Sequence, residues 1–220
     1  MTNFNRIKGE IRTMSEFENV LDEVDEDILN LQLPTPYLRD YYRDEAERIY
    51  RLDHDLTEED LELTKLILRC NKEDKGKPVE ERTPIKVYIN TCGGDVVTLW
   101  SLIQAIQTSK TPVWTINLSY AYSAGAELLV AGHRRFALKG TQVMIHRGGV
   151  CFGGEQSVVE STQKHFAALE KKLTDFLLSH TKIDPKFYKK KASSDIYMDE
   201  EESLRSSVID EIVEDFDILF

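Results

Sequence analysis

Short apolar segments alternate with amphipathic ones through the middle of this chain, and this alternation restricts its fold more than any other feature. Four segments have the length and composition of buried strands: residues 84–90, 112–118, 135–138 and 142–146. Apolar residues at helical spacing predict a helix over 95–108, and 123–132 is predicted as a short buried helix. Strands that alternate with helices form a largely parallel sheet, so the sequence predicts an α/β domain.

The flanking segments extend this pattern on both sides. Thr57 and Asp60 form a capping-box pattern that predicts a helix over 57–70, and the charged residues that follow predict a surface loop over 71–83. The remaining predicted elements are a short strand at 49–52, a long helix at 155–179, a short helix at 185–191, a helix after Asp199 and a strand at 208–213.

The first part of the chain differs in composition from the rest. Residues 1–45 are acidic and polar, and we expect them to form an N-terminal arm that is partly disordered. Residues 46–220 have the size and apolar content of one globular domain.

Charge and cysteine content limit the partners and the compartment. The net charge is −11 over 220 residues, which argues against nucleic acid as a partner, because phosphate binding requires a basic surface. No run of 18 apolar residues is present, so we expect no membrane span. An odd cysteine count without metal-ligand spacing, and a polar N-terminus, favour a cytoplasmic protein.

Three motifs carry residues that an acyl-transfer site requires. Ser123 lies among small residues at the start of a predicted helix, and His146 ends a predicted strand. Gly93 and Gly94 follow another strand and can form a turn with free backbone amides. A serine needs a neighbouring base as activator, and the amides of Gly94 and Ala124 could face a developing oxyanion.

Each motif also has an ordinary structural interpretation when it is taken alone. Ser123 is typical of a helix N-terminus, His146 of a hydrogen-bonded histidine, and the two glycines of a strand-to-helix turn. The sequence offers many carboxylates that could orient the histidine. Asp195 is attractive because it lies beside apolar residues, where burial would hold it rigid; an aspartate in a surface turn is the alternative.

Taken together, the motifs resemble those of the Clp protease proteolytic subunit. The resemblance covers roughly residues 47–214 and rests on the order and spacing of four segments: 85–94, 121–126, 143–146 and 194–197. It implies that Ser123 is the nucleophile, His146 the base and Asp195 the acid, with Gly94 and Ala124 as the oxyanion donors. It also implies a crotonase-like α/β fold, a single domain whose long helix from Glu155 is the handle that joins two rings.

The resemblance further implies an assembly and a mode of substrate binding. The expected particle is a barrel of two stacked heptameric rings, with the active sites facing an inner chamber. The segment 148–154 resembles the family's edge strand, so Gly148, Gly149, Val150 and Cys151, together with Gly93, are expected to bind the polypeptide backbone. We expect no cofactor or metal in this chain, because ATP would be used by a separate AAA+ unfoldase ring.

Some residues depart from the family pattern and leave other functions open. Thr91 and Cys92 stand where the family usually has Ser-Pro, which is compatible with a divergent or virus-encoded member. A capsid-maturation protease of related fold, with the arm as a cleaved or scaffold-binding segment, is one alternative. A catalytically silent ring subunit that binds partners is another, although all three catalytic residue types are present.

Overall fold

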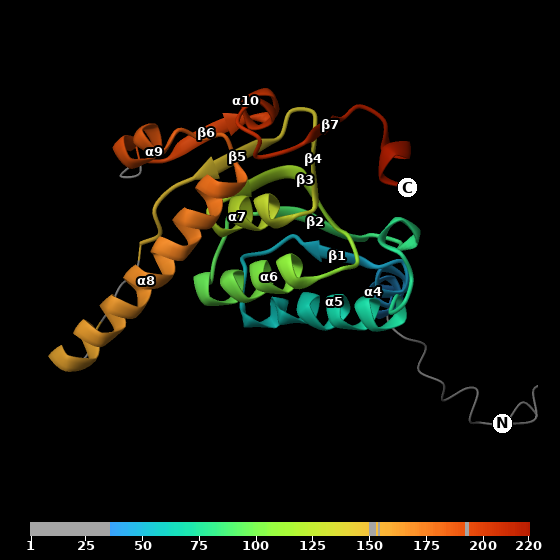
Figure 1. Ribbon diagram of the computed structural model, residues 1–220, viewed down its shortest axis with the longest axis horizontal. Coiled ribbons are helices and arrows are strands. Elements are labelled where there is room, and N and C mark those ends of the chain that lie inside the picture. The colour runs from blue at the N-terminus through green and yellow to red at the C-terminus, as the bar shows by residue number, and fades with distance from the viewer. Residues whose placement is uncertain (1–35, 150–152, 154, 192–193) are drawn as a thin grey trace, which may run out of the picture. The chain divides into compact units, whose positions relative to one another are not determined.

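The computed structural model describes residues 36–149, 153, 155–191 and 194–220 (Figure 1). The chain divides into two compact units, Met1–Arg43 and Asp44–Phe220. Helix α4 (Pro36–Ala46) begins in the first unit, at the end of the predicted arm, where the sequence analysis expected no helix. Residues 1–35 of that arm lie outside the described residues.

The described strands of the second unit form one mixed, mainly parallel sheet, which is the α/β architecture predicted from the sequence. Along its main path, β1-β2-β3-β4-β7, every neighbouring pair is parallel, whereas β5 and β6 form an antiparallel pair beside β3. The strands are β1 (Ile49–Leu52), β2 (Ile85–Thr91), β3 (Val113–Tyr122), β4 (Arg134–Leu138), β5 (Gln142–Ile145), β6 (Ile196–Asp199) and β7 (Glu211–Val213).

Strand β3 is longer than the sequence predicted, and its extension positions the candidate site. Its residues 114–117 pair with β4, and residues 120–122 pair with β5 on the same edge. The predicted strand ended at Leu118. The pairing with β5 continues the strand to Tyr122, so the chain passes directly from the sheet into Ser123.

The described helices follow the predicted order with small changes of boundary. Asp95 caps α6 by accepting a hydrogen bond from the Thr98 amide at 2.6 Å. The predicted helix over 57–70 is divided into a 3₁₀ turn at Glu58–Leu61, which the expected capping box starts, and α5. The helices are α5 (Glu62–Glu73), α6 (Val96–Thr108), α7 (Ala124–Ala131), α8 (Gln156–His180), α9 (Pro185–Lys191) and α10 (Glu200–Arg205), with further 3₁₀ turns at Val79–Glu81 and Phe216–Leu219.

Helix α8 runs beside α7, and its first half extends away from the sheet (Figure 1). Most side chains between residues 156 and 168 are exposed, whereas Leu169, Leu173, Phe176 and Leu177 are buried. In the part of the chain that is described, no helix is both long enough and hydrophobic enough to cross a membrane.

The sheet buries apolar side chains on both faces. Val87 and Ile89 of β2 belong to the large cluster that packs under α5, α6 and α7. Tyr88 lies between them in the chain and belongs to a smaller cluster on the opposite face, with Ile116 and Phe136. Burial on both faces explains why the central strands are nearly continuous apolar runs.

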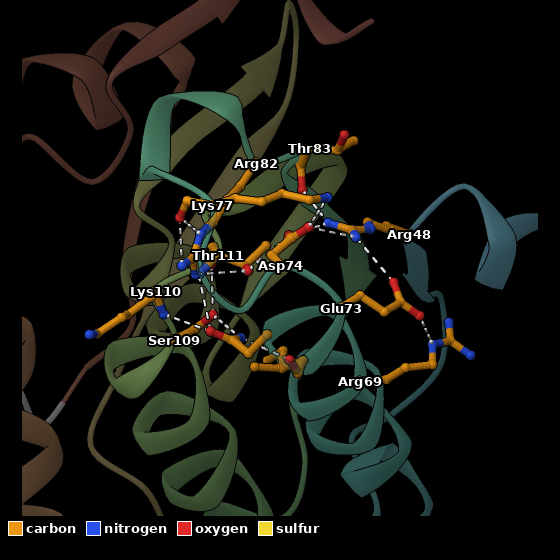
Figure 2. Close-up of polar contacts among 12 residues, drawn as sticks. Arg48, Arg69, Glu73, Asp74, Lys77, Arg82, Thr83, Ser109, Lys110 and Thr111 are labelled. Atoms are coloured by element: carbon orange, nitrogen blue, oxygen red, sulfur yellow. Dashed lines mark hydrogen bonds and ion pairs between the residues drawn. The ribbon is translucent and has the colours of Figure 1, made fainter.

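Most residues of the predicted surface loop over 71–83 are exposed, but Asp74 within it is the centre of a buried ionic network that the sequence did not indicate (Figure 2). Asp74 is fully buried and accepts two hydrogen bonds from Arg48, at 2.6 and 3.1 Å. Lys77 and Thr111 donate to the same carboxylate at 2.9 and 3.1 Å. These bonds hold the pKa of Asp74 well below its usual range, chiefly through Arg48.

Candidate active site

Ser123 occupies a strained backbone position at the junction of β3 and α7. Its φ of 53° and ψ of −122° lie in a region that residues other than glycine rarely adopt, at a cost of about 1–3 kcal/mol. Its amide donates to the Met144 carbonyl at 2.8 Å, and its carbonyl accepts from the Ala126 amide at 2.9 Å. The hydroxyl makes no capping bond to α7, so the turn presents it outward instead of using it to start the helix.

The structure brings His146 and Ser123 together. The distance between His146 Nε2 and Ser123 Oγ is 2.7 Å, a normal hydrogen bond. The contact follows from the sheet register, since Tyr122 of β3 lies beside Met144 of β5 and each strand ends shortly afterwards. A serine hydroxyl in this position can pass its proton to the imidazole.

Asp195 lies on the other side of the imidazole. Its Oδ1 is 3.5 Å from His146 Nδ1, longer than the roughly 3.0 Å of a typical hydrogen bond but within range of an ion pair. Its Oδ2 accepts a long hydrogen bond, 3.4 Å, from the Tyr197 hydroxyl. Of the two environments considered for Asp195, the structure favours the surface one: the side chain is 47% exposed, and the residue immediately precedes the short outer strand β6.

The two glycines form a turn that packs against Ser123. A Cβ atom on Gly93 would lie 2.8 Å from the Ser123 Cβ, and one on Gly94 would lie 2.3 Å from the Leu56 carbonyl oxygen. Both residues have positive φ, 110° and 143°, so the turn requires glycine for both its conformation and its space.

The predicted oxyanion donors are amides without protein partners among the described residues. The Leu56 amide donates to the Gly93 carbonyl at 2.6 Å, and the Leu56 carbonyl accepts from the Asp95 amide at 2.9 Å. The Gly94 amide, between these two bonds, has no hydrogen-bond acceptor among the described residues. The Ala124 amide belongs to the first turn of α7, where backbone donors have no partner within the helix. Two such donors beside a serine hydroxyl could stabilise a developing negative charge.

A cavity of about 340 Å³ opens beside Ser123 and His146. The predicted substrate residues Gly148 and Gly149 line it, and they have no regular secondary structure. Val150 and Cys151 lie outside the described residues, as do 152 and 154 of the expected edge strand. No group of three acidic, histidine or cysteine side chains suited to a metal ion occurs in the described part of the chain.

The cavity also contains two acidic residues that were not predicted as part of the site. Glu127 and Glu170 both line it, and Arg147 donates to Glu170 at 2.6 Å. Burial raises the pKa of Glu127 to about 8, and the nearby charge of Glu170 contributes in the same direction. A signal was present, since Glu127 is the only charged residue in the apolar helix that follows Ser123, one turn away from it.

Comparison with known proteins decides the family. The family described as "Clp protease" matches residues 74–216, which is more than half of the chain. The chain belongs to the Clp protease family. It is also similar to the "ATP-dependent Clp protease proteolytic subunit" of Deinococcus radiodurans, with 32% identity over 143 residues that cover 64% of this chain and 69% of the relative. The matched region of this Clp protease family member contains Ser123, His146 and Asp195.

Proposed function

We propose that this chain is a serine endopeptidase that cleaves unfolded polypeptides within an oligomeric chamber, as the proteolytic component of an ATP-dependent Clp-type protease. The 2.7 Å contact between Ser123 Oγ and His146 Nε2 carries the enzymatic part of the proposal. Membership of the Clp protease family supports the same chemistry.

In the proposed mechanism, Ser123 Oγ attacks the carbonyl carbon of the scissile peptide bond and its proton passes to His146 Nε2. The amides of Gly94 and Ala124 donate hydrogen bonds to the resulting oxyanion. The intermediate collapses to an acyl-enzyme as the leaving amine takes the proton from His146. A water molecule then attacks the acyl carbon as it gives a proton to His146. The ester bond to Ser123 Oγ breaks, the peptide leaves with a new carboxyl group, and Oγ takes the proton back from His146.

Asp195 has an orienting and electrostatic role in this proposal. Its carboxylate faces His146 Nδ1 at 3.5 Å and would stabilise the imidazolium that forms when the serine proton is transferred. Catalytic hydrogen bonds often shorten when substrate binds, so the resting distance is compatible with this role.

The assembly is the second part of the proposal. The D. radiodurans relative is the proteolytic subunit of an ATP-dependent Clp protease by its name, and this similarity supports a separate AAA+ unfoldase partner here. Helix α8 supports ring stacking, because its first half extends beyond the sheet with mostly exposed side chains (Figure 1).

Native mass spectrometry should give a particle near fourteen times the 25.4 kDa of one chain. A monomer at working concentration would contradict the chamber.

The catalytic assignment is tested by Ser123→Ala, with Ser119→Ala as the matched control on the exposed side of β3. We expect Ser123→Ala to lose cleavage of a fluorogenic peptide by about 10³-fold or more. It should also lose labelling by a fluorophosphonate, whereas Ser119→Ala keeps both. Unchanged labelling of Ser123→Ala would remove this serine from the nucleophilic role.

A further inference from the structure

The cavity beside Ser123 carries two carboxyl groups on an otherwise largely apolar lining. Glu127 comes from α7 and Glu170 from α8, and the two helices contact each other. Phe166, Leu169 and Leu173 of α8 provide the apolar wall. Burying a carboxylate in an apolar pocket costs free energy unless the carboxylate has a partner. An acidic pair in this cavity therefore raises the question of which cation could pair with it.

The two carboxyl groups differ in their partners. Glu170 accepts a hydrogen bond from Arg147 Nε at 2.6 Å, so its carboxylate is ion-paired. Glu127 makes no hydrogen bond or ion pair with any other side chain in the described residues. The groups that face it are Glu170 on α8, Arg147 and His146 after β5, and Tyr188 on α9. Of these, only Arg147 is a permanent cation, and it is already bound to Glu170.

The position of Glu127 relative to Ser123 indicates the kind of side chain that could reach it. Glu127 lies in the first turn of α7, which begins directly after Ser123, and both residues line the cavity. The aliphatic stem of a lysine or arginine side chain can lie along an apolar wall while its charged end meets a carboxylate. The cavity, at about 340 Å³, is within the range of small-ligand pockets, which begins near 300 Å³.

We propose that this cavity binds the substrate side chain that immediately precedes the scissile bond, and that Glu127 selects lysine or arginine there. The inference rests on the proposed serine peptidase function. A cationic side chain would supply the counter-charge that Glu127 lacks, so its binding would favour the ionised carboxylate and release the proton to solvent. Leucine at the same position would contact the wall but leave Glu127 without a partner.

This assignment predicts a preference that depends on pH. Burial and Glu170 keep Glu127 protonated at neutral pH, with a pKa of about 8. Selection of lysine over leucine should therefore increase as the pH rises from 7 to 9, because a larger fraction of Glu127 is ionised before binding. The ratio of two substrates measured at one pH cancels any effect of pH on the catalytic steps that both substrates share.

The test uses the full-length protein and peptides that differ only in the residue before the scissile bond: lysine, arginine, glutamine, leucine or glutamate. We expect kcat/KM for lysine to exceed that for leucine at least 10-fold at pH 8.5. Glu127→Gln and Glu127→Leu should reduce this ratio at least 10-fold. Glu201→Gln, an exposed glutamate of α10, serves as the matched control and should leave the ratio unchanged.

A second measurement needs no variant and therefore does not depend on how Glu127 substitutions fold. Peptidyl phosphonates with a lysine-like or a leucine-like group at the same position should inactivate the wild-type protein at rates that differ in the same direction. If a simple fluorophosphonate labels Ser123 normally but the two phosphonates inactivate at equal rates, or the leucine-like one is faster, the selection by Glu127 is overturned. The proposed peptidase function would stand in that case. No labelling of Ser123 by any of these reagents would overturn the proposed function and this inference together.

Discussion

Ile145 of β5 lies opposite Ile196 of β6 in the antiparallel pair, and this register sets where His146 and Asp195 meet. In an antiparallel pair, the residue after one partner lies opposite the residue before the other, so His146 and Asp195 are neighbours across the end of the ladder. Strand β3 brings the serine to the same place, because its last residues pair with β5. The three side chains therefore converge through two strand pairings.

Asp195→Asn should separate the orienting role of this residue from a purely structural one. The amide keeps the shape of the side chain but removes the charge that faces His146 Nδ1 at 3.5 Å. We expect kcat to fall about 100-fold with little change in KM, since general-base catalysis contributes roughly 10²–10⁴. Steady-state kinetics with a fluorogenic peptide measures this, with the exposed Asp217→Asn as control. A decrease of less than threefold would contradict the role.

Gly93→Ala should impair activity through contact with Ser123, the proposed nucleophile. The new methyl group would lie 2.8 Å from the Ser123 Cβ, so the turn and the serine cannot both keep their positions. Gly140→Ala is the matched control, because Gly140 also has positive φ, 82°, but no atom lies within 4 Å of its added Cβ.

Both variants should lose stability by about 1 kcal/mol or more from backbone strain alone. Only Gly93→Ala should also lose kcat/KM, by at least 10-fold, in a peptide assay below the unfolding temperature of both. Equal activity in the two variants would show that the Gly93 turn does not support Ser123.

Sequence reasoning predicted the elements of this domain better than their pairings. The apolar runs of β2 and β3 and the helical spacing in α6 are local signals, and these elements formed within a few residues of the predicted bounds. The division of β3 between β4 and β5 depends on partners that are distant in the chain, so no local pattern indicated it. The resemblance to a family, rather than spacing, selected Asp195 from the many carboxylates.

Burial of single polar residues was the least predictable property. Asp74 lies in a segment of charged residues that has the composition of a surface loop, and its partner Arg48 is 26 residues earlier. For Asp195 the sequence left burial and a surface turn open, and the side chain is half exposed. In both cases the outcome depends on tertiary contacts that composition does not reveal.

Glu127 should make the domain less stable as the pH rises. Its pKa is about 8 in the folded protein and near 4.5 when unfolded, so the folded state binds more protons between these values. The free energy of unfolding should therefore decrease from about pH 5 to pH 8, by at most about 1.4 kcal/mol per pH unit. Urea titrations at pH 5.5, 6.5 and 7.5 give the free energy of unfolding at each pH, and this decrease should be absent in Glu127→Gln. If the free energy of unfolding changes with pH equally in wild type and variant, the raised pKa of Glu127 is contradicted.

Asp74→Asn should be among the most destabilising conservative changes in the chain. The variant leaves Arg48, which is only 13% exposed, with the exposed Glu73 as its remaining acidic partner. Breaking a buried pair typically costs 3–5 kcal/mol, and we expect about 3 kcal/mol here because Glu73 still pairs with Arg48. Asp175→Asn is the matched control: its ion pair with Lys171 is exposed, and its loss should cost about 0.5 kcal/mol or less.

The difference between wild type and Asp74→Asn should also depend on pH in a defined direction. The folded pKa of Asp74 is depressed, so its contribution is complete above the unfolded value near 4 and is lost as the pH falls below it. Chemical unfolding at pH 7, 5, 4 and 3 should therefore give a constant difference at the two higher values and a shrinking one below them. A difference that stays constant down to pH 3 would mean that the Asp74 charge, and its bidentate bond with Arg48, does not stabilise the junction of α5 with β1.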